Sequence, residues 1–276
     1  TKLDARYENL SIQSVQDGLS VKIPRTSILY DLARSADGKT WSGPVKYAME
    51  RMELSEGGDP GISKIGRIEL NGALHEYSPE NARAYEDKLA ALQESAGETP
   101  SPAHMQGLYN TLFDAFSSLW DGFESTMTVS DIALSRPAIP GSPAGSLTIA
   151  KAGMGMNARG FRSDRVNASM KIFYDGLKIV PTPAGFGDAT PDYLNIDVSL
   201  AKLPFREIVE LGRAEMKAVP AGAEPTTAQT AALMTKALQL MTKAGTSFTV
   251  KDSALGNTTY NALLNGQALA DLDAMM

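Results

Sequence analysis

The segment Tyr47–Leu54 reads YAMERMEL and places apolar residues at offsets zero, two, five and seven. Steps of two are typical of a β-strand, because successive side chains point to opposite faces of the sheet. The step of three would move the second half of the strand onto the wrong face. A β-bulge at the polar pair Glu50-Arg51 corrects this, so the segment predicts a bulged strand with one apolar face.

The same spacing recurs elsewhere in the chain. Further complete units are Ala5–Ile12, Met127–Leu134 and Ile172–Ile179, and Phe248–Leu255 repeats the spacing with a serine as its third member. A repeated supersecondary unit indicates one extended sheet. The alternative is chance agreement among short amphipathic strands.

Further strands and turns are expected between these units. Apolar runs that predict companion strands are Leu19–Ile23, Ile62–Leu70, Gly145–Met156, Val166–Phe173 and Leu194–Leu200. The dipeptides Asn71-Gly72 and Asn265-Gly266 follow apolar runs and predict hairpin turns.

Helical periodicity appears at 79–93, at 102–121 and at 204–244, where prolines break the last stretch into a pair. The apolar stripe of each helix needs a partner surface, which the repeated strand face supplies. The sequence therefore predicts a single α+β domain over residues 1–276. Its curved, bulged antiparallel sheet carries helical insertions at about 79–121 and 204–244, packed on the apolar, concave face.

The composition limits the possible partners. The 276-residue chain is 43% hydrophobic and 21% charged, which is typical of a folded protein. Its 26 basic and 32 acidic residues give a net charge of −6, which argues against binding to nucleic acid. No apolar run approaches the length of a membrane span, so the sequence predicts no transmembrane segment in this chain.

Two features bear on the compartment. The chain has no cysteine, which spares an exported protein from mispaired disulfides. It begins at Thr1 rather than at a methionine, so we expect that a signal or anchor segment has been removed. The absence of cysteine fits a reducing or an oxidising compartment, and because it suits an exported protein it favours a bacterial periplasm.

The sequence offers few groups for catalysis. His75 and His104 are far apart, and neither has a sequence-level partner that would make it a general base or a metal ligand. The glycine-rich stretch 153–160 departs from G-x-G-x-x-G and is followed by a strand-like segment, so a turn or edge is expected. The sequence therefore predicts no enzyme, no catalytic residue, no metal site and no cofactor.

The repeat itself supplies candidate ligand contacts. Methionines occupy strand positions where β-branched residues are usual, and flexible thioethers suit an interior that adapts to a mobile apolar guest. A core that simply tolerates methionine is the alternative. The predicted groove residues are Tyr47, Met49, Met52, Met127, Ile132, Leu134, Met170, Ile172, Tyr174 and Leu177.

Three arginines lie at the end of the glycine-rich stretch and directly after it. Arg159, Arg162 and Arg165 stand at a spacing of three and are candidates for holding a phosphate or a lipid headgroup. The alternative is a solvated turn.

The units KYAMERMELSE (46–56), TMTVSDIALSRP (126–137) and SMKIFYDGLKI (169–179) resemble the repeating strands of AsmA-like and related periplasmic proteins of Gram-negative bacteria. The resemblance is one of strand pattern and includes no diagnostic motif. It implies a curved antiparallel sheet with an apolar groove, behind an N-terminal anchor or signal, and a role in lipid transport or envelope maintenance. This chain departs from the pattern in its shortness and its sizeable helices.

Two functions follow from this reading. The first is a periplasmic binding or carrier protein for a lipid or other apolar molecule, held between the helices and the sheet. The second is a non-catalytic envelope scaffold that contacts other envelope proteins and fills its groove with its own helices. An envelope hydrolase has the least support, because no site can be assembled.

Overall fold

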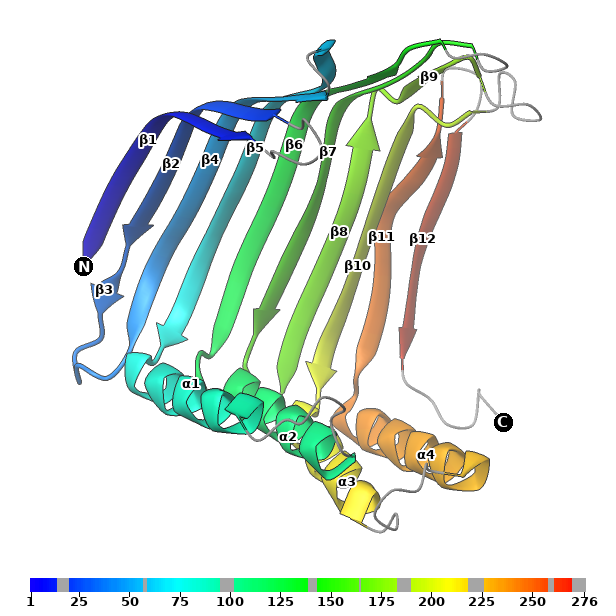
Figure 1. Ribbon diagram of the computed structural model, residues 1–276. Coiled ribbons are helices and arrows are strands. Elements are labelled where there is room, and N and C mark those ends of the chain that lie inside the picture. The colour runs from blue at the N-terminus through cyan, green and yellow to red at the C-terminus, as the bar shows by residue number, and fades with distance from the viewer. Residues whose placement is uncertain are drawn as a thin grey trace.

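Figure 1 shows a computed structural model of the protein, which describes residues 1–13, 20–56, 59–94, 102–138, 143–163, 165–182, 190–217, 226–257 and 261–269. The prediction of an α+β fold is confirmed, because these residues form one open twelve-stranded antiparallel sheet with α-helices at one end.

The sheet is a meander in which almost every strand pairs with its neighbour in sequence. The strands are β1 (Lys2–Gln13), β2 (Ser20–Asp31), β3 (Ala33–Arg34), β4 (Trp41–Glu56), β5 (Asp59–Tyr77), β6 (Gly122–Arg136), β7 (Gly145–Arg159), β8 (Val166–Asp175), β9 (Lys178–Val180), β10 (Tyr193–Leu203), β11 (Ser247–Gly256) and β12 (Asn261–Leu269). The spatial order is β1-β2-β4-β5-β6-β7-β8-β10-β11-β12, with β3 beside β4 and β9 beside β7.

A left-handed residue marks every repeat unit at the same offset. The fourth offset is occupied by Asn9, Arg51, Asp131, Gly176 and Asp252, whose φ angles lie between 48° and 68°. A left-handed residue changes the direction of a strand, and it is costly for any residue except glycine. Five such residues at one offset confirm that the extra residue of the repeat is a real backbone feature.

The predicted single-strand bulge is correct only for the last unit. There the register shifts between Val250 and Ser253, as a bulge requires. In the other units the register is unbroken, because the facing strand takes the same step of three. The residues that face one another along this line are Asn9, Pro24, Arg51, Gly66, Asp131, Ala150 and Gly176.

We call this line the crease. The strands bend near it, at the end of the sheet away from the helices (Figure 1). Ile23 and Thr26, which flank the crease on one face, are buried, whereas Pro24 and Arg25 are exposed. Side chains on the inner side of a bend approach one another, so this contrast places the apolar side chains on the inner side.

Gly66 is required where β5 crosses the crease. A Cβ atom on Gly66 would lie 2.7 Å from Cβ of Asp131 and 2.8 Å from its Oδ2. We expect Gly66→Ala to lower the free energy of unfolding by about 1–3 kcal/mol through overpacking. Asp131→Gly removes the obstructing atoms, so the double variant should recover most of the loss. Urea titrations of the four proteins measure this coupling, and additive effects would contradict it.

The helices do not lie where the sequence predicts. They are α1 (Pro79–Glu94), α2 (Pro102–Ser118), α3 (Phe205–Lys217) and α4 (Thr227–Ala244), close to the expected ranges. They run along one end of the strands, as Figure 1 shows, rather than over a face of the sheet. The helices pack mainly on one another, so packing on the concave face is a wrong prediction.

Two hairpin predictions are also wrong, because Asn71-Gly72 lies inside β5 and Asn265-Gly266 lies inside β12. Gly72 is instead a point of close approach, since a Cβ there would meet the backbone oxygen of Glu124 at 2.7 Å. Asn265 accepts a hydrogen bond from the backbone N–H of Asp252 at the bulge. Both asparagine-glycine pairs therefore serve strand contacts rather than turns.

The buried core is small and lies where the helices meet the sheet. One cluster joins Ala82, Ala115 and Leu119, and the other joins Ala158, Phe161 and Val166. The chain exposes 17504 Å², whereas a compact monomer of 29.4 kDa exposes about 11,500 Å². A sheet that is one layer thick over most of its area contributes to this excess of roughly 6,000 Å².

Candidate ligand-binding face

One face of the sheet is apolar from β1 to β10. The central row of strand partners is Ala5, Ile28, Tyr47, Leu70, Met127, Met154, Ile172 and Ile196. Neighbouring strands lie about 4.8 Å apart, so this row spans roughly 34 Å. We call this row and the parallel rows on the same side the apolar face.

The strand register brings nine of the ten predicted groove residues onto the apolar face. Three of them, Tyr47, Met127 and Ile172, belong to the central row. Met49 and Tyr174 lie in the next row towards the crease, and Met170 lies in the next row towards the helices. Met52, Ile132 and Leu134 lie beyond the crease. Leu177 follows the left-handed Gly176 and is half-buried. Contact of these residues with a ligand stays a prediction.

Much of the apolar face is open to solvent. Met127, Met154, Met156 and Met170 are between 38% and 40% exposed, although each is flanked by paired strands. Among the described residues, the elements that pack against these strands are mainly their neighbours in the same sheet. Contiguous apolar surface of this size is rare on a monomer and usually marks a binding surface.

The opposite face of the sheet is charged. Arg25 lies 3.7 Å from Glu50, and Arg67 lies 2.6 Å from Glu69, between oxygen and nitrogen atoms of their side chains. These pairs are exposed and contribute little to stability. Their role is to keep one face polar, which distinguishes the two faces of a single-layered sheet.

The apolar face ends in a hollow beside the helices. The hollow has a volume of about 400 Å³, and its walls include Tyr30, Leu70, Leu74, Trp120 and Phe123. Its lining also includes Gly72, whose missing side chain leaves room at this point. The hollow is therefore continuous with the central row through Leu70.

A second apolar groove lies among the helices, where the sequence analysis places no site. It has a volume of about 640 Å³ between α2, α3, α4 and the end of β10, and its walls include Phe113, Phe205, Ile208, Leu233 and Met234. The signal in the sequence is the apolar periodicity of 205–217 and 227–244 together. Their partner face on α2 could not be read from the sequence.

Polar contacts hold this helical groove together. Arg213 on α3 donates to Asp114 Oδ1 on α2 at 2.6 Å and to Glu210 Oε1 at 2.8 Å. The hydrogen bond to Asp114 is the largest cause of the raised pKa of Arg213. Lys236 on α4 forms an ion pair with Glu215 on α3. The groove thus has a charged rim and an apolar floor.

The three arginines proposed for a headgroup each have a carboxylate partner. Arg159 lies 2.6 Å from Glu124. Arg165 lies 2.9 Å from Glu207 on α3. Each positive charge is thus balanced by a carboxylate of a different element, which weakens the case for an anion site.

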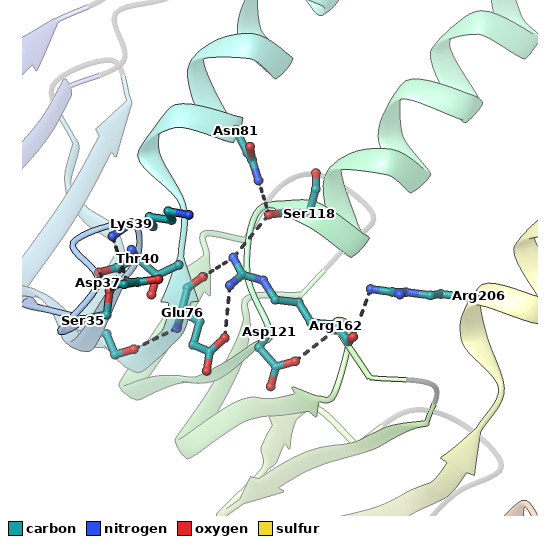
Figure 2. Close-up of polar contacts among 11 residues, drawn as sticks. Ser35, Asp37, Lys39, Thr40, Glu76, Asn81, Ser118, Asp121, Arg162 and Arg206 are labelled. Carbon is teal, nitrogen blue, oxygen red and sulfur yellow. Dashed lines mark hydrogen bonds and ion pairs between the residues drawn. The ribbon is translucent and has the colours of Figure 1, made fainter.

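Arg162 bonds to several groups at once (Figure 2). Its guanidinium lies 3.1 Å from Glu76 Oε2 and donates to the Glu76 carbonyl at 2.7 Å. Its backbone N–H donates to Asp121 Oδ1, and its carbonyl accepts from Arg206. Arg162 therefore fastens the turn after β7 to β5 and α3.

His75 and Glu124 meet at the same end of the sheet. His75 Nε2 lies 3.2 Å from Glu124 Oε1. The hydrogen bond from Arg159, with smaller contributions from the charges of Arg159 and His75, lowers the pKa of Glu124. A carboxylate kept ionised in this way is an ion-pair partner rather than a proton donor at neutral pH.

The stretch 153–160 is strand in the structure, not the predicted turn or edge, up to Arg159. Gly153 is required because a Cβ there would lie 2.6 Å from the Phe173 ring. Only Gly160, with φ of 90°, lies in the turn that follows. His104 lies on α2, and the described part of the chain contains no cluster of metal-binding side chains.

Comparisons with known proteins give no relative. Among the described helices, none combines the length and apolar character needed to cross a membrane. No family model, no curated protein and no solved structure matches the chain.

Proposed function

We propose that this protein binds and carries a lipid or another apolar molecule on the apolar face of its sheet. The observation that carries the proposal is the open apolar face itself, where large apolar side chains stand in ordered rows and none of the described helices packs across them. A bound acyl chain gains roughly 25 cal/mol for each Å² of apolar area removed from water. No charged anchor is then needed for affinity.

The side chains of the apolar face suit a flexible guest. Met127 and Met154 are direct partners in the central row, and Met156 and Met170 are direct partners in the next row. Unbranched thioethers adapt to guests of different shape. Tyr47 and Tyr174 add hydroxyl groups that can orient the polar end of an amphipathic ligand.

The placement of the helices separates the two candidate functions. A scaffold with a self-filled groove needs helices over the apolar face, whereas the described helices lie at the strand ends and pack mainly on one another. This arrangement supports ligand binding over a self-filled scaffold. The periplasmic location is part of the proposal and rests on the resemblance and the absence of cysteine.

Titration with a fluorescent fatty acid and a fluorescent zwitterionic phospholipid tests the proposal. The Met127→Gln/Met154→Gln variant should bind both probes about ten-fold more weakly, which is about 1.4 kcal/mol. Gln is uncharged, so repulsion of an anionic headgroup plays no part. Affinity should change little with salt, because the contact is apolar.

A matched control uses the opposite face of β6. Thr126 and Thr128 flank Met127 in sequence, so their side chains point to the charged face. Thr126→Gln/Thr128→Gln should therefore leave affinity within two-fold. Equal losses in both variants, or no saturable binding of either probe by the unchanged protein, would overturn lipid binding and favour a scaffold.

A further inference from the structure

A ladder of alternating charge crosses the sheet next to the crease. On the charged face, consecutive strand partners are Glu8, Arg25, Glu50, Arg67, Ser130, Lys151 and Asp175. Acidic or neutral residues stand on β1, β4, β6 and β8, and basic residues stand on β2, β5 and β7. The two sets of strands therefore have different chemistry at the same height.

The backbone alternates in the same way. In β1, β4, β6 and β8 the residue directly after the acidic or neutral residue of the ladder has a left-handed backbone. These left-handed residues are Asn9, Arg51, Asp131 and Gly176. The second set has Pro24, Gly66 or Ala150 immediately before the basic residue, opposite a left-handed residue. We call the first set kinked strands and the second set companion strands.

Space explains why companion strands need these residues. A Cβ on Gly66 would clash with Asp131, and a Cβ on Gly176 would lie 2.7 Å from Cβ of Ala150. At the crease, the companion strand therefore has glycine, alanine or proline opposite each left-handed residue of a kinked strand. A strand without this feature crosses a left-handed residue only with a shift of register, as β12 does opposite Asp252 of β11.

β1 is a kinked strand with a companion on one side only. β2 pairs with its inner side, and no described strand pairs with its outer side. Its apolar residues are correspondingly open, with Tyr7 at 58% and Ile12 at 56% exposure. Unpaired edges of this length are templates for strand addition.

We propose that the outer edge of β1 binds an antiparallel strand of the companion type, supplied by a partner polypeptide. That strand has apolar residues at positions one, three, six and eight, proline, glycine or alanine at position four, and arginine or lysine at position five. Position four faces Asn9, and position five faces Glu8, as Pro24 and Arg25 do on the inner side. A strand that alternates regularly needs a shift of register to keep its apolar side chains on one face across the kink, as β12 does beside β11, whereas a companion strand pairs without one.

A second copy of this chain is a poorer fit. β12 at the other edge alternates without a kink, since Ala262, Leu264, Gly266 and Ala268 are the partners of the β11 unit. Two copies could also pair through β1. In the antiparallel register that aligns their apolar faces, Glu8 of each copy lies opposite Asn9 of the other, so Glu8 has no basic partner in either copy. A second copy of this chain is therefore not the proposed partner.

A fluorescent peptide with the sequence of residues 61–72 (GISKIGRIELNG) is the probe, because this segment of β5 is a companion strand. We expect saturable binding to the intact protein by fluorescence anisotropy. Deletion of the glycine that corresponds to Gly66 should weaken binding, because it removes the step of three and the peptide can then pair only with a shift of register. Binding equal to that of the parent peptide would overturn the proposal.

A charge swap locates the peptide on β1. Replacing the peptide arginine that corresponds to Arg67 by glutamate should weaken binding about two- to five-fold, the usual range for an exposed ion pair. Glu8→Lys in the protein should restore it. As a control, Glu53→Lys changes an exposed acidic residue of β4, inside the sheet, and should not rescue the peptide.

Two results would reject the edge site. Failure of Glu8→Lys to rescue, in a variant whose circular dichroism spectrum is unchanged, shows that the peptide binds elsewhere. Concentration-dependent dimers of the unchanged protein that the parent peptide dissociates show that β1 pairs with a second copy instead. Light scattering measures the latter.

Discussion

Replacing Phe161 by alanine is expected to lower the free energy of unfolding by about 3–5 kcal/mol. The side chain is only 6% exposed. Its ring packs against Phe123 at 6.3 Å and against Phe205 on α3 at 5.4 Å, measured between ring centres. Few other buried apolar residues join the helices to the sheet, so little remains to compensate for the cavity.

Urea unfolding followed by circular dichroism measures this loss. Leu264→Ala is the control, because it removes an apolar side chain of similar size that is 62% exposed on the edge strand β12. Its effect should stay within about 0.5 kcal/mol. A loss below about 1 kcal/mol at Phe161, or equal losses at both positions, would mean that the junction is not the main core.

The strand pattern could be predicted from the sequence because a strand with one apolar face has an apolar residue at every second position. The step of three was visible too, since it occurs at the same offset in unit after unit. It marks left-handed residues such as Asn9, Arg51 and Asp131, none of which is a glycine. Their conformation is thus specified by the strand pairing and not by local propensity.

The step in the companion strands was harder to recognise. Val21, Ile23, Thr26 and Ile28 follow the same offsets, but no polar pair or left-handed residue marks the step. The step in β2 is visible only when β2 is aligned with β1 across the ladder. Register between strands is a non-local property, and for this reason the crease could not be derived from single segments.

The positions of the helices also depend on non-local contacts. An amphipathic stripe requires an apolar partner but does not identify it. The sheet has the larger apolar surface, yet α3 and α4 pack on each other and α2 contacts α3. The prediction of helices on the concave face was wrong because the sequence does not show whether a helix packs on the sheet or on another helix.

The candidate site was predicted better in its apolar part than in its charged part. Nine groove residues share one face because strand periodicity fixes the direction of a side chain. The roles of Arg159, at the end of β7, and of Arg162 and Arg165, after it, could not be predicted in the same way. Their partners Glu76, Glu124 and Glu207 are distant in sequence, and only the fold brings them within reach.

Deletion of Asp131 is expected to cost more than about 3 kcal/mol in the free energy of unfolding. Without this residue β6 alternates regularly, so Ile132 and Leu134 turn from the apolar to the charged face or lose their partners Ile65 and Ser63. Burial of an aliphatic side chain is worth about 1.5–3 kcal/mol. Both side chains are affected together, and the ladder to β7 is disrupted as well.

A substitution at position 131 tests whether β6 needs the extra residue itself or the side chain of Asp131. Asp131→Gly keeps the step of three and adopts the observed φ of 53° without the penalty of a Cβ atom. We expect its stability to stay within about 1 kcal/mol of the unchanged protein. Guanidinium titrations followed by tryptophan fluorescence and circular dichroism compare the two variants. If the deletion is tolerated as well as the substitution, the crease is not required by the sheet, because strands without the kink can then pair across it.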